Sequence, residues 1–309
     1  MDTSIIIPVY NEEKNISILM DKLMQSSGLV GKEWEVIFIN DGSKDNTFEV
    51  LKSFKPKVPQ LKIINFGINA GKAAAYSAGF QFASGQIVIT MDGDLQDDPA
   101  EIPSFLHAIE RGVDLVVGWK YRGKGKRSKT IISKIFNFFL GMLTGLHIND
   151  SNCPFRAMRN EVAKNLNLYG ELYRFIPYLA FQKGYSIAEI KVENYPRQFG
   201  TSKYGVSRIF NGLMDLMTVL FITRYSRSPL HFFGIPGLIS LLSGIGIDSF
   251  LVFRGLLITG RIGHTALLLM GVLLIIIGIQ FISLGLLGEL FISTKKADLK
   301  DLPIKEVVG

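Results

Sequence analysis

The stretch Ile87-Val88-Ile89-Thr90-Met91-Asp92-Gly93-Asp94-Leu95-Gln96-Asp97-Asp98-Pro99 leads from a run of apolar residues into a cluster of acidic ones. The apolar run is short and rich in β-branched residues, which is typical of a buried strand. Asp92 and Asp94 follow it, so two carboxylates emerge together at the carboxyl end of that strand. In open α/β sheets this edge binds ligands. The stretch therefore predicts a strand that ends in a ligand site, although a bare Asp-x-Asp fits a solvated acidic turn equally well.

A divalent cation would explain why the acidic side chains lie so close together. Neighbouring carboxylates repel each other unless a cation lies between them, and Mg²⁺ takes one or two protein carboxylates together with water and substrate phosphates. Side-chain alternation sends Asp92 and Asp94 to the same side, and Gln96 adds a neutral amide oxygen. We predict that these three residues hold Mg²⁺ or Mn²⁺.

Strands and helices alternate through the first part of the chain. The strands are predicted at 4–9, 35–40, 61–65, 87–91 and 114–118. The helices are predicted at 15–26, 47–54 and 71–82, and the first of them carries Ile16, Leu19, Met20 and Leu23 on one face. Asp97 and Asp98 are predicted to cap a further helix, because Pro99 fits its first turn. This alternation predicts a doubly wound, mostly parallel α/β sheet.

Composition and charge narrow the class of protein. The chain has 309 residues, 48% of them hydrophobic, and a formal net charge of +7. Much of the positive surplus lies at 120–134 and 197–227, which favours an anionic membrane leaflet or phosphate ligands. Nucleic acid is not expected as a partner, because no nucleic-acid-binding motif accompanies the charge. Cys153 is the one cysteine, so no intramolecular disulfide can form, and a reducing compartment fits.

Two apolar runs, at 229–253 and 265–291, are each long enough to cross a bilayer. Asp248 interrupts the first run and is expected to face protein or lipid headgroups. Basic residues flank the pair of runs more densely than the connector between them, which predicts a multi-pass membrane protein with both chain ends in the cytoplasm. Amphipathic segments at 130–146 and 206–223 fit helices that lie at the membrane interface, and they also fit ordinary helices with one face packed on the core. Glycines in the spans would permit close helix packing, and so a homo-oligomer.

Six short motifs occur in order along the chain. They are Ile7-Pro8-Val9-Tyr10-Asn11-Glu12-Glu13, Asn40-Asp41-Gly42-Ser43-Lys44-Asp45-Asn46-Thr47, Asn69-Ala70-Gly71-Lys72, Met91 to Pro99, Asp150-Ser151-Asn152-Cys153-Pro154-Phe155-Arg156, and Arg197-Gln198-Phe199-Gly200-Thr201-Ser202-Lys203-Tyr204. With the two apolar runs, they resemble family 2 glycosyltransferases of the polyprenyl-phosphate branch. The resemblance covers nearly the whole chain, but Cys-Pro-Phe-Arg stands where many relatives have Gly after the Cys.

The resemblance implies a GT-A-like nucleotide-sugar domain at 1–204, a juxtamembrane helix at 205–228, a two-helix hairpin at 229–292 and a tail at 293–309. It also implies inverting transfer of a hexose from a nucleotide sugar to a polyprenyl phosphate, such as undecaprenyl phosphate. UDP-glucose is the first choice of donor, followed by UDP-GlcNAc and GDP-mannose. A processive polysaccharide synthase is an alternative, but its Q-x-x-R-W motif is absent. A non-catalytic scaffold that binds a nucleotide sugar is another.

Candidate roles follow for individual residues. The resemblance implies that Pro8, Tyr10, Glu12 and Asp41 bind the nucleoside. It also implies the same metal ligands, Asp92, Asp94 and Gln96. It favours Asp94 and Asp150 as catalytic acidic residues. Asp41 and Asp150 also fit ordinary turns. Asp92 is a candidate for the nucleotide as well, Gly71 permits close backbone approach, and Lys72 is predicted to meet a nucleotide phosphate or the acidic site. The candidates for covering the acceptor phosphate are Lys120, Lys129, Ser133, Arg197 and Lys203.

Overall fold

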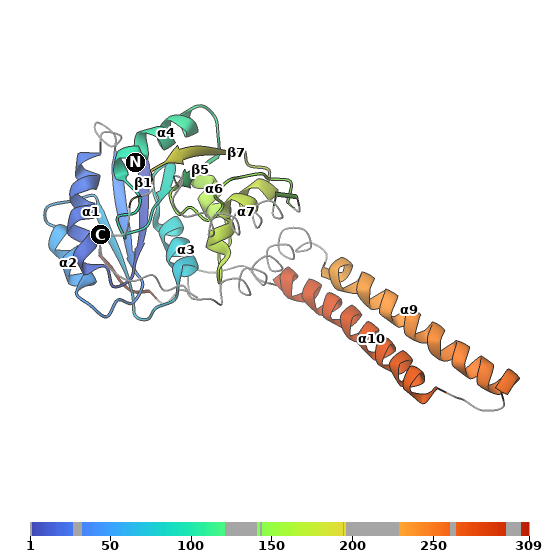
Figure 1. Cartoon of the computed structure of the whole chain (residues 1–309). Helices are drawn as coiled ribbons and strands as arrows, with labels where there is room; N and C mark the ends of the chain where they lie inside the picture. The colour runs from blue at the N-terminus through green and yellow to red at the C-terminus, as the bar shows by residue number, and fades with distance from the viewer. Residues whose placement is uncertain are drawn as a thin grey trace. The chain divides into compact units, whose positions relative to one another are not determined.

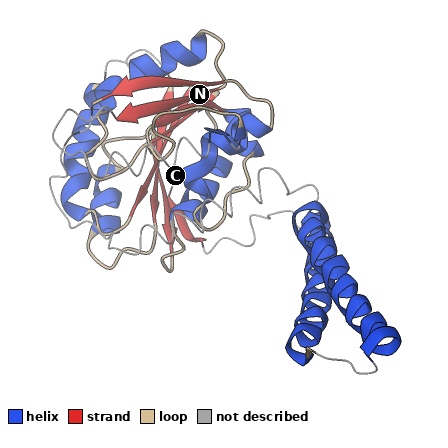
Figure 2. Ribbon diagram, turned by 45° about the vertical axis from the view of Figure 1, so that its right-hand side comes forward, coloured by secondary structure: helices blue, strands red, loops and turns tan. Residues whose placement is uncertain are grey.

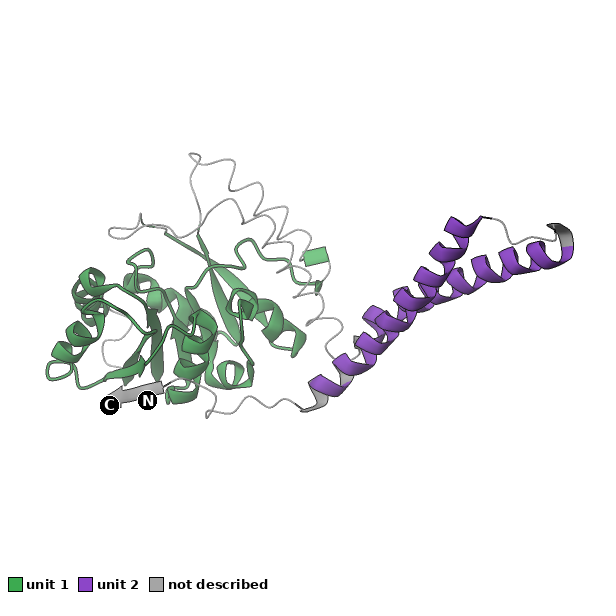
Figure 3. Ribbon diagram, turned by 90° about the horizontal axis from the view of Figure 1, so that it is seen from below, with its two compact units in different colours: residues 1–216, 297–309 green, residues 217–296 purple. Residues whose placement is uncertain are grey.

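The computed structural model describes residues 2–26, 33–120, 141–142, 144–193, 195, 229–259, 264–294 and 304–308. The chain divides into two compact units, the first comprising residues 1–216 and 297–309 and the second residues 217–296 (Figure 3). The predicted boundary at 204 and the helix predicted at 206–223 lie outside the described residues. So does most of the amphipathic segment at 130–146.

Within the described residues, one sheet of eight strands forms the centre of the first unit, in the order β7-β5-β6-β4-β1-β2-β3-β8. The strands are β1 (Thr3–Val9), β2 (Trp34–Asn40), β3 (Leu61–Phe66), β4 (Ile87–Thr90), β5 (Leu115–Lys120), β6 (Arg156–Arg159), β7 (Ile187–Val192) and β8 (Ile304–Val308). Strands β4, β1, β2 and β3 are parallel neighbours, as are β5 and β7. The predicted mostly parallel α/β sheet is confirmed, but β6 and β8 run antiparallel to their neighbours.

Helices cover both faces of this sheet (Figures 1 and 2). They are α1 (Glu13–Gln25), α2 (Thr47–Phe54), α3 (Lys72–Phe82), α4 (Ile102–Glu110), α6 (Asn160–Asn165) and α7 (Ile176–Gln182), with 3₁₀ turns η1 (Pro99–Glu101) and η2 (Leu172–Phe175). The apolar face predicted for the first helix is the buried face of α1. Helix α3 packs closely because its residues are small: a methyl group at Gly79 would lie 2.5 Å from Ile6 Cγ2. With both faces covered, every residue of β1 and β2 is buried.

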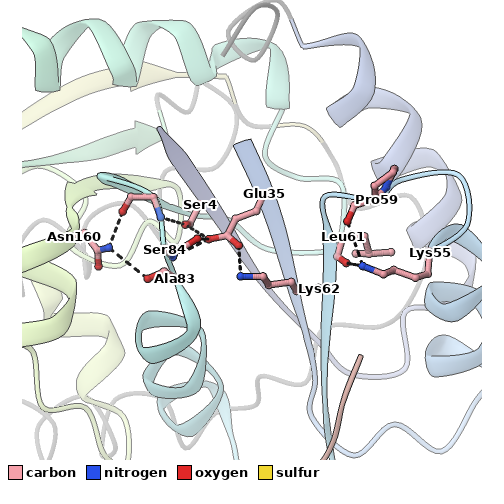
Figure 4. A network of polar contacts seen from close by, with 10 residues as sticks. Ser4, Glu35, Lys55, Pro59, Leu61, Lys62, Ala83, Ser84 and Asn160 are labelled. Carbon is pink, nitrogen blue, oxygen red and sulfur yellow. Dashed lines mark hydrogen bonds and ion pairs between the residues drawn. The ribbon is translucent and has the colours of Figure 1, made fainter. Parts of the chain in front are cut away.

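A buried carboxylate ties the amino-terminal ends of the strands together. Glu35, near the start of β2, accepts hydrogen bonds from Ser4 Oγ at 2.5 Å and from Ser84 N and Oγ, both at 2.7 Å (Figure 4). Lys62 Nζ of β3 lies 2.6 Å from Glu35 Oε2. This network joins β1, β2, β3 and the turn before β4 at the edge opposite the acidic stretch. It therefore holds the sheet without occupying the carboxyl-terminal edge.

The second unit is a helical hairpin, α9 (Pro229–Arg254) followed by a short π-helical turn η3 (Gly255–Thr259) and then α10 (Thr265–Thr294). Among the described residues, these two helices are long and apolar enough to cross a membrane. They approach through glycine: a methyl group at Gly244 would lie 2.5 Å from the Gly271 carbonyl oxygen. Ser240 Oγ donates to Leu274 O at 2.9 Å. Asp248 lies directly against Gly271 of α10, so it faces protein, as expected.

Candidate active site

The predicted acidic residues lie on a loop, residues 91–98, that follows β4; we call it the acidic loop. Both carboxylate oxygens of Asp92 accept from Lys72 Nζ at 2.8 Å. Lys72 is the first residue of α3 and follows Gly71, whose φ of 87° turns the chain into the helix. Of the two contacts predicted for Lys72, the structure shows the one with the acidic loop, and the contact with a nucleotide phosphate stays a prediction.

The charge of Asp92 is set by its surroundings. Burial alone would raise the pKa of this carboxyl, but the positive charges of Lys72, Lys120 and Arg156, with Lys72 contributing most, together outweigh burial and hold the pKa below its usual value. The pKa of Lys72 is raised, because its attraction to Asp92 exceeds the cost of burying the ammonium. Lys72 Nζ also lies 6.0 Å from the centre of the Tyr173 ring on η2. The two side chains therefore form a charged pair within the site.

Asp94 and Gln96 complete the predicted ligand set. Asp94 is 4% exposed, and its Oδ1 accepts from Gln96 N at 3.2 Å. Leu95 between them has a φ of 63°, a left-handed conformation that a side chain rarely adopts. No three His, Cys, Asp or Glu residues of the described chain form a metal cluster. Two carboxylates and an amide nevertheless fit Mg²⁺ or Mn²⁺, which takes only one or two protein carboxylates when substrate phosphates supply other oxygens.

The capping prediction holds for Asp98 but is wrong for Asp97. Asp98 Oδ1 accepts from Ala100 N at 3.1 Å at the start of η1, with Pro99 at its first position. Asp97 turns inward instead: its Oδ2 accepts from Asp92 N at 3.1 Å, and Lys120 Nζ lies 2.6 Å from its Oδ1. Sequence alone does not reveal this pair, because Lys120 comes from β5, far along the chain.

The carboxyl ends of β1 and β2 lie beside the acidic loop, because these strands follow β4 in the sheet. Asp41, after β2, accepts from Ala70 N at 2.7 Å and Gly71 N at 3.0 Å and so shapes the loop that leads to Lys72. Pro8 is buried in β1, Tyr10 is half-buried, and Glu12 N donates to Thr47 Oγ1 at 2.9 Å. The fold therefore brings the predicted nucleotide residues to one edge of the sheet.

Asp150 lies on a turn before β6 that two other residues hold. Glu189 of β7 accepts from Asn149 N at 2.8 Å and Asp150 N at 3.1 Å. Arg156 of β6, which is 1% exposed, donates to Ser151 O at 3.2 Å and to Tyr173 O at 3.0 Å. The sequence analysis did not predict that Glu189 or Arg156 would hold this turn. Arg156 stands in a quoted motif that could have pointed to it, whereas Glu189 belongs to none.

The remaining acceptor candidates, Lys129, Ser133, Arg197 and Lys203, lie outside the described residues. Cys153 is buried, and burial raises the pKa of its thiol, which agrees with a structural role.

The site and fold match a known family. The model of Glycosyl transferase family 2 matches residues 4–166, more than half of the chain. The chain belongs to this family. The match covers β1 through β6, and so it includes the acidic loop, the Asp41 loop and the Asp150 turn of this family 2 member.

Curated relatives of this family 2 chain extend beyond that match. A dodecaprenyl-phosphate galacturonate synthase of Rhizobium johnstonii is 35% identical, covering 96% of this chain and 90% of the relative. An undecaprenyl-phosphate 4-deoxy-4-formamido-L-arabinose transferase of Pectobacterium carotovorum is 33% identical, covering 93% of this chain and 87% of the relative. Both coverages take in the hairpin as well as the sheet.

Solved structures support the GT-A-like fold of this family 2 member. Glucosyl-3-phosphoglycerate synthase from Mycobacterium tuberculosis, solved with Mn²⁺ and UDP-glucose, superposes with a TM-score of 0.54 at 16% identity, covering 71% of this chain and 78% of that one. TarS from S. aureus superposes with a TM-score of 0.51 at 20% identity, covering 72% and 66%. At these identities the likeness establishes the fold alone.

Proposed function

We propose that this protein transfers a sugar from a nucleotide sugar to a polyprenyl phosphate at the membrane surface. The observation that carries the proposal is the acidic loop at the carboxyl edge of the sheet, which bears Asp92, Asp94 and Gln96 beside the ends of β1 and β2 and contacts Lys72 through Asp92. Two relatives that match nearly the whole chain are named for transfer to dodecaprenyl or undecaprenyl phosphate. The apolar hairpin supplies a membrane anchor beside such a lipid.

Charge neutralisation is the main task of such a site, because a nucleoside diphosphate sugar must approach an anionic lipid phosphate. Asp92, Asp94 and Gln96 would hold Mg²⁺ or Mn²⁺. The bound cation would stabilise the charge that grows on the diphosphate leaving group. For Asp92 to bind the cation, Lys72 Nζ would have to move away from the Asp92 carboxylate oxygens. The freed ammonium would then lie within reach of a donor phosphate.

The acceptor needs positioning more than activation. A lipid phosphate is already ionised near neutral pH, so its oxygen can attack the anomeric carbon directly, with inversion and release of the nucleoside diphosphate. Asp150 orients the acceptor or the reacting sugar, and Glu189 and Arg156 hold its turn. Lys120, Lys129, Ser133, Arg197 and Lys203 remain our candidates for the acceptor phosphate.

The identity of the sugar is the finer part of the proposal. UDP-glucose remains the first donor to test, followed by UDP-GlcNAc and GDP-mannose. The names of the relatives add a galacturonate donor and a 4-deoxy-4-formamido-L-arabinose donor to the panel. We place the protein in the cell inner membrane with the catalytic unit in the cytoplasm, because basic residues flank the hairpin ends.

The test is a donor panel on membranes that contain the full chain. Each radiolabelled nucleotide sugar is incubated with undecaprenyl phosphate and Mg²⁺, with and without EDTA, and lipid-linked label is measured. We expect one donor to give a product that EDTA abolishes. Nucleotide-sugar binding without lipid-linked product for every donor would contradict the proposal and favour the scaffold alternative.

A further inference from the structure

A buried ion pair between Asp97 and Lys120 lies beside the acidic loop, and the chemistry described above gives Asp97 no role. Asp97 is 1% exposed and the Lys120 side chain 9% exposed, and Asp97 Oδ1 and Lys120 Nζ lie 2.6 Å apart. Removing two charges from water is costly, and attraction between them does not always compensate. A pair kept at such a cost, directly behind a candidate metal site, requires a reason other than the stability of the core.

Asp97 closes the loop that carries the predicted metal ligands. Its second oxygen, Oδ2, accepts from Asp92 N at 3.1 Å, so one side chain bridges the start and the end of the turn. Leu95, inside this turn, has a left-handed φ of 63°. A side-chain-bearing residue keeps such a conformation only when surrounding contacts hold it there. The bond from Asp97 to Asp92 N is one of those contacts.

Lys120 anchors Asp97 from a different part of the sheet. It is the last residue of β5, whereas the acidic loop follows β4, and β6 lies between these two strands. The ion pair therefore spans the intervening strand and attaches the loop to the far side of β6.

We propose that Asp97 is a positioning residue, with Lys120 as its charge partner, and that the pair holds the acidic loop in the shape in which Asp92, Asp94 and Gln96 share one divalent cation. This inference rests on the proposed function and deepens it. Carboxylates that hold metal ligands in place from behind typically influence metal affinity about 10–100-fold. Lys120 thereby gains a role on the donor side of the reaction, in addition to the acceptor contact predicted from its charge.

The test measures Mn²⁺ binding to the full-length protein in detergent by the electron paramagnetic resonance signal of free Mn²⁺. Mn²⁺ is titrated alone, with UDP and with GDP. We expect Asp97→Asn to weaken binding about 10–100-fold, and Lys120→Met to weaken it in the same direction. The double variant Asp97→Asn/Lys120→Met leaves no unpaired buried charge, so it guards against a fold lost in either single variant. Its loss should be close to the larger single loss, because two residues that act through one contact are not additive.

A matched control and a second readout separate positioning from general damage. Lys164→Met removes an exposed lysine of α6 and should leave Mn²⁺ binding unchanged. Amide hydrogen exchange at Asp92 should accelerate in Asp97→Asn, because the one acceptor oxygen of the Asn amide cannot serve both Asp92 N and Lys120 Nζ, while exchange in β1 and β2 stays slow.

The outcomes are distinct. The inference is overturned if Asp97→Asn binds Mn²⁺ like the wild type, or if Lys120→Met changes only the apparent KM for the lipid acceptor. A wild-type protein that binds Mn²⁺ with UDP or GDP but transfers no sugar refutes the proposed function, and the binding comparison still decides the role of Asp97. A wild-type protein that binds no Mn²⁺ under any of the three conditions overturns both.

Discussion

The two units of this chain place their apolar and small residues in opposite ways. In the first unit, Ile5, Ile6 and Ile7 of β1 are fully buried. In the second, Leu256 is 70% exposed and Phe291 67% exposed, whereas glycines form the contact between the helices. A water-soluble unit buries large apolar side chains, while helices in lipid gain little from doing so and associate through small residues. The contrast indicates that the two units are built for different solvents.

Polar groups follow the same division. The first unit buries charged groups and pairs them, as Glu35 with Lys62 and Asp97 with Lys120 show. In the hairpin, the side chain of Ser240 donates a hydrogen bond across the helix contact to Leu274 O. Asp248 is an exception to the apolar character of the hairpin, and it lies against Gly271. Removing charged groups from the first unit and adding large side chains at the glycine contact of the hairpin therefore tests this contrast.

The largest effect is expected at the polar edge of the first unit. Asp94→Ala removes a proposed metal ligand, and we expect transfer to fall at least about a thousandfold, since loss of transition-state charge stabilisation has effects of that order. The measurement is lipid-linked product formed by the full chain in membranes. Asp21→Ala, which removes an exposed carboxylate of α1, should leave transfer unchanged. Near-normal turnover of Asp94→Ala would remove the metal assignment.

The hairpin should respond most to bulk at the contact between its helices. Gly244→Leu places a large side chain against Gly271, and we expect a loss of about 3 kcal/mol in stability from overpacking. Gly246→Leu is the matched control, because a methyl group there has no atom within 4 Å. Thermal unfolding of the two variants in detergent makes the comparison. Equal stability of the two variants would argue against the described helix contact.

The buried pair at the opposite edge of the sheet is expected to show a pH dependence. Burial would raise the pKa of Glu35, but Lys62, Ser4 and Ser84 outweigh it and lower the pKa below its ordinary value of 4.5. A lowered pKa in the folded state means that the ionised carboxyl stabilises the protein above about pH 4.5 and that this contribution is lost as the pH falls through the folded-state value.

Glu35→Gln should therefore cost about 2 kcal/mol near neutral pH, because its amide would turn a donor toward Lys62. The cost should shrink in acid. Thermal unfolding from about pH 7 down to about pH 2, through the lowered pKa of Glu35, measures it, with the exposed Glu49→Gln as control. A cost that does not change with pH would contradict an ionised Glu35.

The smallest effect is expected at β8, which supplies backbone pairing to the edge of β3. Val307→Pro removes a backbone donor opposite Ile64, and we expect a loss of about 1 kcal/mol and greater self-association, since an uncovered edge strand can pair with other chains. Val307→Thr keeps the backbone intact and should behave like the wild type. Light scattering of the purified protein distinguishes the two variants. Equal scattering would mean that β8 does not protect this edge.

The parallel centre of the sheet could be predicted because its strands are short apolar runs that recur between helices. The helix predicted at 47–54 coincides with α2, and the strand at 35–40 differs from β2 by one residue. β6 could not be predicted, because Arg-Ala-Met-Arg has no strand pattern and owes its conformation to pairing with β4 and β5. The alternation of apolar and charged residues in β7, from Ala188 to Val192, is in contrast typical of a strand.

The parts of the candidate site that lie directly after a predicted strand could be predicted from the sequence. The order of strands and acidic residues brought Asp92, Asp94 and the Asp41 loop to one edge. Asp97 was misassigned because its partners, Lys120 and the amide of Asp92, are fixed by the three-dimensional path of β5 and not by local turn preferences. Long-range pairs of this kind, including Glu189 with the Asp150 turn, need the structure.

Strand β8 has a consequence for the membrane topology that we propose. It pairs with β3 of the sheet, yet it comes after both apolar helices in the sequence. A strand can pair only with a neighbour in the same compartment, so the membrane topology that we propose requires an even number of crossings between β3 and β8. A variant that gained or lost a single span would carry the last residues to the opposite face and leave β3 without its antiparallel neighbour.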